Sequence, residues 1–274
     1  MSAEGALRGA SIALIGAGNM GLALLEGWAA HGLSGPDAAI VEPQPSLRLQ
    51  SLCAAHGFLL NGATAPRDAV LLAVKPQMLE AGAETAASFI GEETVVVSIL
   101  AGKRIADLAG RLPDARAIVR AMPNTPAAIG RGVTGAYANP ETGPAQRALA
   151  DALLATVGGV EWVESEALID AVTAVSGSGP AYVFYLVECL TAAGVDAGLP
   201  EALAGRLARA TVEGAGELLH RQSETSAETL RQRVTSPGGT TAAALEVLSA
   251  SDGLAALMRR AVAAAKRRAG ELSG

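Results

Sequence analysis

A glycine-rich run near the start of the chain is the first place where residue types and spacing point to chemistry. Residues 11–21 read Ser-Ile-Ala-Leu-Ile-Gly-Ala-Gly-Asn-Met-Gly, so Gly16, Gly18 and Gly21 form a GxGxxG between an apolar run and the helical segment 22–30. In this context the first glycine permits a tight turn, the second lets a pyrophosphate approach the backbone, and the third allows close packing of helix on strand. The run predicts a dinucleotide site, with a purely structural glycine turn as the alternative.

Residues on either side of this turn are placed to contact the rest of a dinucleotide. Asn19 and Met20 lie at the turn that leads into this helical segment, whose first, unpaired backbone N–H groups can receive an anion. Glu42 lies 21 residues after Gly21, at the end of the next predicted strand. An acidic residue there binds the ribose 2′-hydroxyl of NAD and would repel a 2′-phosphate. Arg48, on the next helical turn, could instead reach a phosphate, so the choice between NAD and NADP stays open. Glu42 could also be a solvated loop carboxylate.

Two more turns fall at the ends of predicted strands, the edge of an open α/β sheet where ligands bind. The first reads Ala-Val-Lys-Pro, and Val74 and Lys75 stand directly before Pro76, which keeps Lys75 out of helical backbone geometry. This suits a contact to ribose or nicotinamide, although an ordinary surface lysine is the alternative. In the second, two prolines stiffen the loop around Asn124 and Thr125, whose side chains could orient a carboxamide or simply build a rigid turn.

Two glycine-rich interruptions stand in the otherwise helical second half of the chain. Residues 176–180 read Ser-Gly-Ser-Gly-Pro and residues 235–241 read Thr-Ser-Pro-Gly-Gly-Thr-Thr. Both precede a predicted helix, so each offers unpaired N–H groups and small hydroxyls, which suit a carboxylate. Capping alone could explain Ser178. The second run has more than a cap needs, because its paired glycines stand with four hydroxyls, those of Thr235, Ser236, Thr240 and Thr241.

The elements that must position these residues divide the chain into two parts. Up to about residue 160, short β-rich runs alternate with helical segments, a βαβ pattern with right-handed crossovers. The predicted strands, several of them apolar on both faces as a covered parallel sheet requires, are Ser11–Ile15, Ala38–Val41, Gly57–Leu60, Ala69–Val74, Thr94–Ile99, Ala117–Ala121 and Val133–Ala138. Beyond Trp162 the predicted helices are Ala167–Val175, Ala181–Ala197, Pro200–His220, Ala227–Val234, Thr241–Ala250 and Leu254–Glu271. We therefore predict an α/β fold, with a Rossmann-type doubly wound sheet over 1–162 and an all-helical domain over 163–274.

Composition excludes several classes of protein. A net charge of −6 with 3% aromatic residues argues against nucleic-acid binding. The longest apolar stretch, Ala181 to Val195, contains Glu188 and is too short to span a membrane, so it is expected to be a buried core helix. Cys53 and Cys189 are far apart, form no CxxC, and have no nearby histidine pair, so we expect no metal site and two small buried residues. A cytoplasmic location is expected.

Over nearly its whole length the sequence resembles the pyrroline-5-carboxylate reductases, which catalyse the last step of proline synthesis. The resemblance implies hydride transfer from NADPH or NADH to the ring imine of 1-pyrroline-5-carboxylate, giving L-proline. It also implies a homodimer formed through the helical domain. The apolar helices of that domain are too numerous for a monomer to cover, which favours the same state. Assembly beyond the dimer stays open. The motifs that carry it are Gly16-Ala-Gly-Asn-Met-Gly21, Ala73-Val-Lys-Pro76, Met122-Pro-Asn-Thr-Pro126, Asp170-Ala-Val-Thr-Ala-Val-Ser-Gly-Ser-Gly-Pro-Ala-Tyr182 and Val234-Thr-Ser-Pro-Gly-Gly-Thr-Thr241.

The resemblance also assigns roles to individual residues. Asn61 and Ala101 fall where the family contacts the cofactor, and the Thr241 hydroxyl falls near the ring nitrogen of the substrate. Residues implied to bind the substrate carboxylate are Ser236, Gly238, Gly239, Thr240 and Thr241. One departure is that the segment from Glu42 to Pro45 lacks the small hydroxyls or arginine that members favouring NADPH often place there. Glu224 is a candidate for an acidic residue near the substrate, and its role stays open.

Two other functions compete with this interpretation. A β-hydroxyacid dehydrogenase shares the same plan of domains but relies on a catalytic lysine in the helical domain, and no lysine stands between Ser176 and Ser251. A redox-sensing protein that holds NAD(P) without turnover is the second. The chain has no histidine placed as a general base, and imine reduction needs none, because the imine nitrogen can arrive protonated. Turnover of pyrroline-5-carboxylate separates the three functions.

Overall fold

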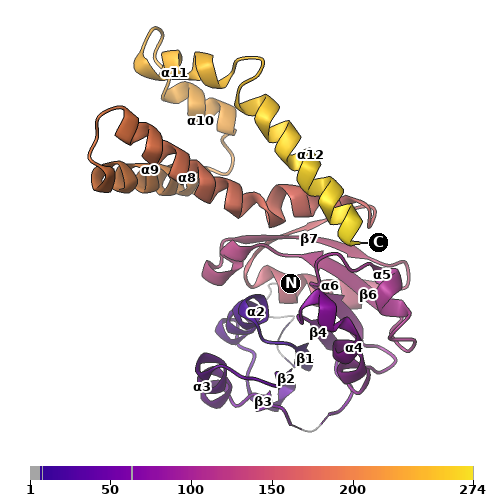
Figure 1. Ribbon diagram of the computed structural model, residues 1–274. Coiled ribbons are helices and arrows are strands. Elements are labelled where there is room, and N and C mark those ends of the chain that lie inside the picture. Colours follow the sequence, from indigo (N-terminus) through magenta and orange to yellow (C-terminus); the bar gives the residue numbers. More distant parts are fainter. Residues whose placement is uncertain (1–6, 8, 63, 274) are drawn as a thin grey trace. The chain divides into compact units, whose positions relative to one another are not determined.

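The computed structural model describes residues 7, 9–62 and 64–273, which form two compact units (Figure 1). The first runs up to Gly177 and also takes in the chain from Ala265 onward; the second is Ser178–Ala264. This division differs from the predicted boundary after Trp162. Residues 163–177 belong to the sheet unit because their helix packs on it, with Val172 filling the space that a side chain at Gly135 would occupy.

The first unit is built on one eight-stranded sheet, in the order β3-β2-β1-β4-β5-β6-β7-β8. The strands are β1 (Ile12–Ile15), β2 (Ala38–Val41), β3 (Leu59–Leu60), β4 (Ala69–Leu72), β5 (Val95–Ser98), β6 (Ala117–Met122), β7 (Gly132–Ala138) and β8 (Gly158–Trp162). Strand β1 pairs with both β2 and β4, so the strand order reverses there (Figure 1). This reversal opens a crevice at the carboxyl ends of the strands, the usual ligand position in such sheets.

The sheet departs from the predicted one at its far edge. All seven predicted strands are present, but β8 was not predicted, because it begins with two glycines, which have poor strand propensity. The βαβ pattern does not extend to β7, which runs antiparallel to β6. The connecting residues 123–131 contain only the short helix η3 (Thr125–Ile129), whereas a parallel crossover needs a dozen or more residues.

Helices cover both faces of the sheet and bury two separate cores. One core takes side chains from α2 (Asn19–Ala30), α3 (Leu47–His56) and α6 (Pro144–Ala155). The other takes them from α4 (Leu79–Ala87) and α5 (Ile105–Ala109).

The first core also encloses the Cys53 thiol, and burial raises the pKa of this thiol. The prediction that Cys53 is a small buried residue is therefore confirmed.

A buried arginine on β6 forms ion pairs and a hydrogen bond with residues near the C-terminus of the chain and at α7. The Arg120 guanidinium, which is 4% exposed, lies 3.2 Å from a carboxylate oxygen of Glu166 and 3.4 Å from one of Asp170. It also donates to the hydroxyl of Ser273, at 3.4 Å. Asp170 stands on α7 (Leu168–Val172), which leads into the π-helical turn η4 (Thr173–Gly177). The charge therefore fixes α7 and the last residues of the chain against β6.

The second unit is entirely helical. Its elements are α8 (Gly179–Asp196), α9 (Glu201–Arg221), α10 (Ala227–Arg233), α11 (Thr240–Leu248) and most of α12 (Leu254–Leu272), each within three residues of its predicted bounds. The close contact of α8 with α9 depends on a small residue, since a Cβ at Gly194 would lie 3.1 Å from that of Ala204. No described helix is long and apolar enough to cross a membrane.

One expectation for this unit is wrong. The apolar helix α8 was expected to be buried, yet it has no buried residue in the single chain, and Cys189 on it is exposed as well. Phe184 and Tyr185 are 63% and 65% exposed. The apolar sequence of such a helix predicts that its surface is buried, but it does not distinguish burial within the same chain from burial against a second chain.

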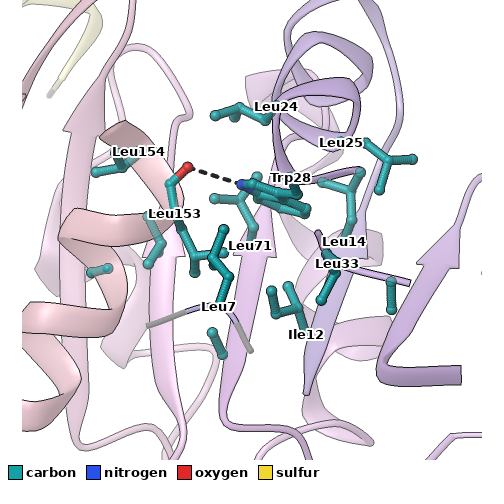
Figure 2. Close-up of a cluster of buried hydrophobic side chains, with 14 of the residues drawn as sticks. Leu7, Ile12, Leu14, Leu24, Leu25, Trp28, Leu33, Leu71, Leu153 and Leu154 are labelled. Carbon is teal, nitrogen blue, oxygen red and sulfur yellow. Dashed lines mark hydrogen bonds between the residues drawn. The ribbon is translucent and has the colours of Figure 1, made fainter. Parts of the chain in front are cut away.

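The core beneath α2 allows a test of the packing. Trp28 is fully buried, and its indole N–H donates to the Leu153 carbonyl at 2.9 Å (Figure 2). We expect Trp28→Ala to lower the free energy of unfolding by about 3–5 kcal/mol through the cavity it leaves. Trp28→Phe should cost only about 0.5–1.5 kcal/mol, because the Leu153 carbonyl loses the indole donor but still accepts from the Thr156 hydroxyl at 2.9 Å. Urea denaturation followed by circular dichroism measures both.

Leu47, which is 81% exposed, supplies the control for this series. Leu47→Ala should change the free energy of unfolding by no more than about 0.5 kcal/mol. If Trp28→Ala proved as mild as Leu47→Ala, the description of this core would be wrong.

Candidate cofactor and substrate sites

The glycine loop after β1 is held against the end of β4 at a distance that only glycine permits. Gly16 has φ +89°, and a Cβ there would lie 2.9 Å from backbone atoms of Ala73. Its N–H donates to the carbonyl of Val41 at the end of β2. A Cβ at Gly21 would meet the Gly16 carbonyl oxygen at 2.5 Å. These contacts bring the start of α2 onto the carboxyl ends of β1, β2 and β4, where the motif predicted it.

Gly18 serves a different purpose from its two neighbours. It is the N-cap of α2, with an ordinary φ of −66°, and no other part of the protein lies within 4 Å of where its Cβ would stand. No side chain caps the helix, and both Gly18 and Asn19 are exposed. The first turn of α2, including Met20, therefore presents backbone N–H groups to open space, as a pyrophosphate requires.

The carboxylate of Glu42 is fixed beside this loop. One oxygen accepts a hydrogen bond from the Ala17 N–H at 2.9 Å, and the other accepts one from the Gln44 N–H at 3.1 Å. The backbone of Glu42 exchanges two hydrogen bonds with the side chain of Asn61, each 2.9 Å long. Glu42 is therefore not a freely solvated loop carboxylate. Asn61, which has φ +50°, thus holds the backbone of Glu42 in place.

Two cavities lie at this edge of the sheet. The first, of about 370 Å³, joins predicted residues from three strand ends: Gly16, Gly18, Glu42, Val74 and Lys75. The second, of about 310 Å³, joins Met20, Val74, Pro76, Ala101 and Asn124. Val74 borders both, so the cavities adjoin. The structure thus brings nine of the predicted cofactor residues to these two cavities, whereas Asn19, Gly21 and Asn61 line neither of them.

The Asn124 side chain is engaged by the fold. Its amide N–H donates to the carbonyl of Ser176 at 3.2 Å, and its amide oxygen accepts from the Val133 N–H at 2.9 Å. Asn124 is only 9% exposed. It joins the loop after β6 to the π-helical turn, as the alternative of a rigid turn describes, and it contributes to the cavity mainly by holding that wall in place.

Sequence reasoning missed one wall of the first cavity. Met78, Gly82 and Thr85 line it from η2 (Pro76–Met78) and α4. The signal available in the sequence is their spacing, since Gly82 follows Met78 by four residues and Thr85 follows Gly82 by three, which places them on one helical face. Gly82 is needed there, because a Cβ would lie 2.9 Å from a methyl carbon of Val74.

The predicted substrate loop opens α11 in the second unit. Gly239 is the N-cap, without a side-chain cap, and Gly238 has φ +68°. The hydroxyl of Thr235 donates to the carbonyl of Arg231 at 2.7 Å, so it serves the preceding helix. Three of the four predicted hydroxyls thus stand around an uncapped helix start, those of Ser236, Thr240 and Thr241. At the other glycine-rich run, the Ser178 side chain does not cap α8.

The glycine loop lies where the strand order reverses, and an acidic residue stands at the end of β2. Together these features define a dinucleotide-binding oxidoreductase of the Rossmann type. Residues 11–102 match a family model described as NADP oxidoreductase coenzyme F420-dependent, and residues 166–272 match one described as pyrroline-5-carboxylate reductase dimerisation. The pyrroline-5-carboxylate reductase of Pseudomonas aeruginosa is 42% identical over 96% of each chain. The chain belongs to the pyrroline-5-carboxylate reductase family.

Solved structures agree with this assignment. The structure of a pyrroline-5-carboxylate reductase from Coxiella burnetii superposes with a TM-score of 0.88, at 36% identity, covering 97% of this chain and 99% of that one. A Plasmodium falciparum pyrroline carboxylate reductase with NADP bound has a TM-score of 0.78, at 25% identity, with coverage of 97% and 99%. The sheet unit is thus an NAD(P)-binding unit, and the helical part carries the dimerisation domain of the family.

The contrast between Gly16 and Gly18 can be tested directly. Gly18→Ala should leave the melting temperature unchanged, since its Cβ meets no protein atom. It should weaken binding of NADH and NADPH at least about tenfold, roughly 1.4 kcal/mol, because the methyl group stands where the pyrophosphate approaches. Gly16→Ala should lower the melting temperature as well. Isothermal titration calorimetry and thermal melts separate the two effects.

Gly159→Ala on β8 is the matched control, because its Cβ also meets nothing within 4 Å but lies outside both cavities. Unchanged cofactor affinity in Gly18→Ala would show that the pyrophosphate does not pass this residue.

Proposed function

We propose that this protein reduces 1-pyrroline-5-carboxylate to L-proline, with NADPH or NADH as the hydride donor, in the last step of proline synthesis. The observation that carries the proposal is the uncapped Gly-Gly-Thr-Thr start of α11, an anion receptor of the kind that a small imino acid needs, in a chain of this family. Membership of the family supports the reaction class, oxidation and reduction at a C=N bond.

The residues of the first unit would hold the cofactor. Bound there, the reduced nicotinamide supplies a hydride. The start of α2 at Gly18 to Met20 receives the pyrophosphate, Glu42 takes the adenosine ribose, and the loop containing Ala101 and Asn124 forms the wall of the second cavity. The cradle fits because Gly16 brings the backbone close and Gly18 leaves space in front of it.

The residues of the second unit would hold the substrate. Backbone N–H groups at Thr240 and Thr241, with the Ser236 hydroxyl, bind the carboxylate, and the dipole of α11 favours its negative charge. The Gly239 N–H donates to the Ser236 carbonyl at 3.0 Å, so Gly238 and Gly239 contribute by shaping the loop. The Thr241 hydroxyl orients the ring nitrogen. No side-chain base is required, because the imine nitrogen carries its own proton, so the protein contributes alignment and a fixed electrostatic field.

We further infer that the protein is a homodimer, formed through the helical domain predicted over residues 163–274. The support is the apolar surface of α8 that α9 leaves exposed, on which Phe184 and Tyr185 stand. Monomeric proteins rarely expose a large contiguous apolar patch. The cytoplasmic location expected from the sequence stays a prediction.

Turnover tests the proposal as a whole. Purified protein is mixed with pyrroline-5-carboxylate and either reduced cofactor, and the loss of cofactor absorbance is followed while L-proline is measured. Turnover with proline formation is the expected result. Oxidation of a β-hydroxyacid with NAD(P) would favour the competing dehydrogenase, and cofactor binding without any turnover would favour the redox sensor.

The role of the α11 loop predicts a graded series of variants. Thr241→Ala should lower kcat/KM about 10- to 100-fold, if one positioned hydrogen bond worth about 1.4–2.7 kcal/mol is lost. Thr241→Ser should retain most of the activity, because it keeps the hydroxyl. Thr235→Ala is the control, since that hydroxyl bonds to the Arg231 carbonyl. An unaltered kcat/KM in Thr241→Ala counts against this role.

Light scattering coupled to gel filtration tests the dimer. The wild-type chain should elute at twice the mass of one chain, and Phe184→Glu should shift the population toward monomer, because a charge is costly in an apolar interface. Leu47→Glu replaces an equally apolar exposed residue of the sheet unit and should leave the dimer intact. A stable wild-type monomer would overturn the proposal.

A further inference from the structure

We propose that Glu42 makes this protein discriminate between the two nicotinamide cofactors, so that it binds NADH at least about tenfold more tightly than NADPH. The two cofactors differ only by a phosphate on the 2′-oxygen of the adenosine ribose. A carboxylate at the end of the second strand of a dinucleotide fold accepts hydrogen bonds from the ribose hydroxyls and repels a phosphate there. The inference concerns cofactor binding and does not depend on the substrate proposed above.

The position of the Glu42 carboxylate is fixed by the protein. The Ala17 N–H, within the glycine loop, donates to one oxygen, and the Gln44 N–H donates to the other. The carboxylate is therefore held beside the loop that receives the pyrophosphate, and it lines the first cavity. Moving it away from a 2′-phosphate would break both hydrogen bonds, so the side chain cannot simply rotate aside.

From Glu42 to Pro45 the backbone leaves no N–H group free for a phosphate. The Glu42 N–H donates to the side chain of Asn61, and the Gln44 N–H donates to Glu42 itself. Pro43 and Pro45 have no N–H group. The next helix, α3, is capped by the hydroxyl of Ser46 and does not line the cavity. A phosphate placed here would gain no hydrogen bond from these backbone groups, and the Gln44 side chain, which lines the cavity, offers only an uncharged amide donor.

The two nearby cations, Arg48 and Lys75, are not placed to bind a 2′-phosphate: Arg48 is paired with a carboxylate, and Lys75 follows a different strand from Glu42. Arg48, the candidate phosphate ligand, makes two hydrogen bonds to the carboxylate of Glu26, at 2.7 and 2.8 Å. This paired, planar arrangement holds the guanidinium against α2, and the Arg48 side chain is 70% exposed. Lys75 is the one cation among the described residues that line the cavity. It follows β4, whereas Glu42 follows β2, and β1 lies between these two strands, so Lys75 serves the other half of the cofactor.

Direct binding measurements test the proposal without any turnover. Isothermal titration calorimetry of the full-length protein gives Kd for NADH and NADPH, and also for ADP-ribose and 2′-phospho-ADP-ribose, which carry no nicotinamide. In both pairs the phosphorylated form should bind at least about tenfold more weakly, roughly 1.4 kcal/mol. Glu42→Gln removes the charge and keeps an oxygen that can accept from Ala17, and it should bring the ratio within about threefold.

Glu84→Gln supplies the matched control. Glu84 is an exposed carboxylate on α4, on a side of the helix that does not line the cavity, and its substitution changes the net charge by the same amount. It should keep the wild-type ratio. A second variant, Glu42→Ser, repeats the test with a small hydroxyl if Glu42→Gln fails to fold, and folding is checked by circular dichroism.

Two results would overturn the proposal. One is a wild-type protein that binds NADPH as tightly as NADH or within tenfold of it. The other is a ratio that persists in folded Glu42→Gln or Glu42→Ser, which would place the discrimination elsewhere. Failure to reduce pyrroline-5-carboxylate would refute the proposed reaction but leave these binding ratios unaffected, so the two proposals fail separately.

Discussion

The cofactor site depends on one steric constraint, the approach of Gly16 to the backbone at the end of β4. A side chain at this position would collide with Ala73. Because the loop can lie so close, its next N–H, that of Ala17, reaches Glu42 on the neighbouring strand end. The same approach sets the start of α2 above the crevice where the strand order reverses. Without it, the residues from β1, β2 and β4 would not share one cavity.

Both candidate anion sites use the same device, a helix that begins at glycine without a side-chain cap. Gly18 opens α2 and Gly239 opens α11. Two other helices have a serine cap instead: Ser46 accepts from the backbone of α3, and Ser226 does so for α10. A serine cap satisfies the N–H groups that an anion would otherwise take. The absence of that cap at Gly18 and Gly239 leaves those groups to a ligand.

Residue patterns predicted the elements and the cofactor loop well, because both follow from local spacing. They failed where distant partners decide the outcome. The strand at Gly158 has little strand propensity and forms because β7 offers an edge. The exposure of α8 depends on what covers the helix, and the engagement of Thr235 with Arg231 depends on local loop geometry. The fixed orientation of Glu42 requires Ala17 and Gln44 to converge on it, which spacing along the chain does not reveal.

The burial of Trp28 has an optical consequence. The chain contains two tryptophans, and this one is shielded from water on the same helix that starts at the glycine loop. It lies nine residues after Asn19, the first residue of α2. At about 1.5 Å per residue, that is roughly 13 Å along the helix axis. Buried indole fluoresces in the range where a reduced nicotinamide absorbs. Binding of the reduced cofactor near the start of this helix should therefore quench the fluorescence of Trp28 by energy transfer.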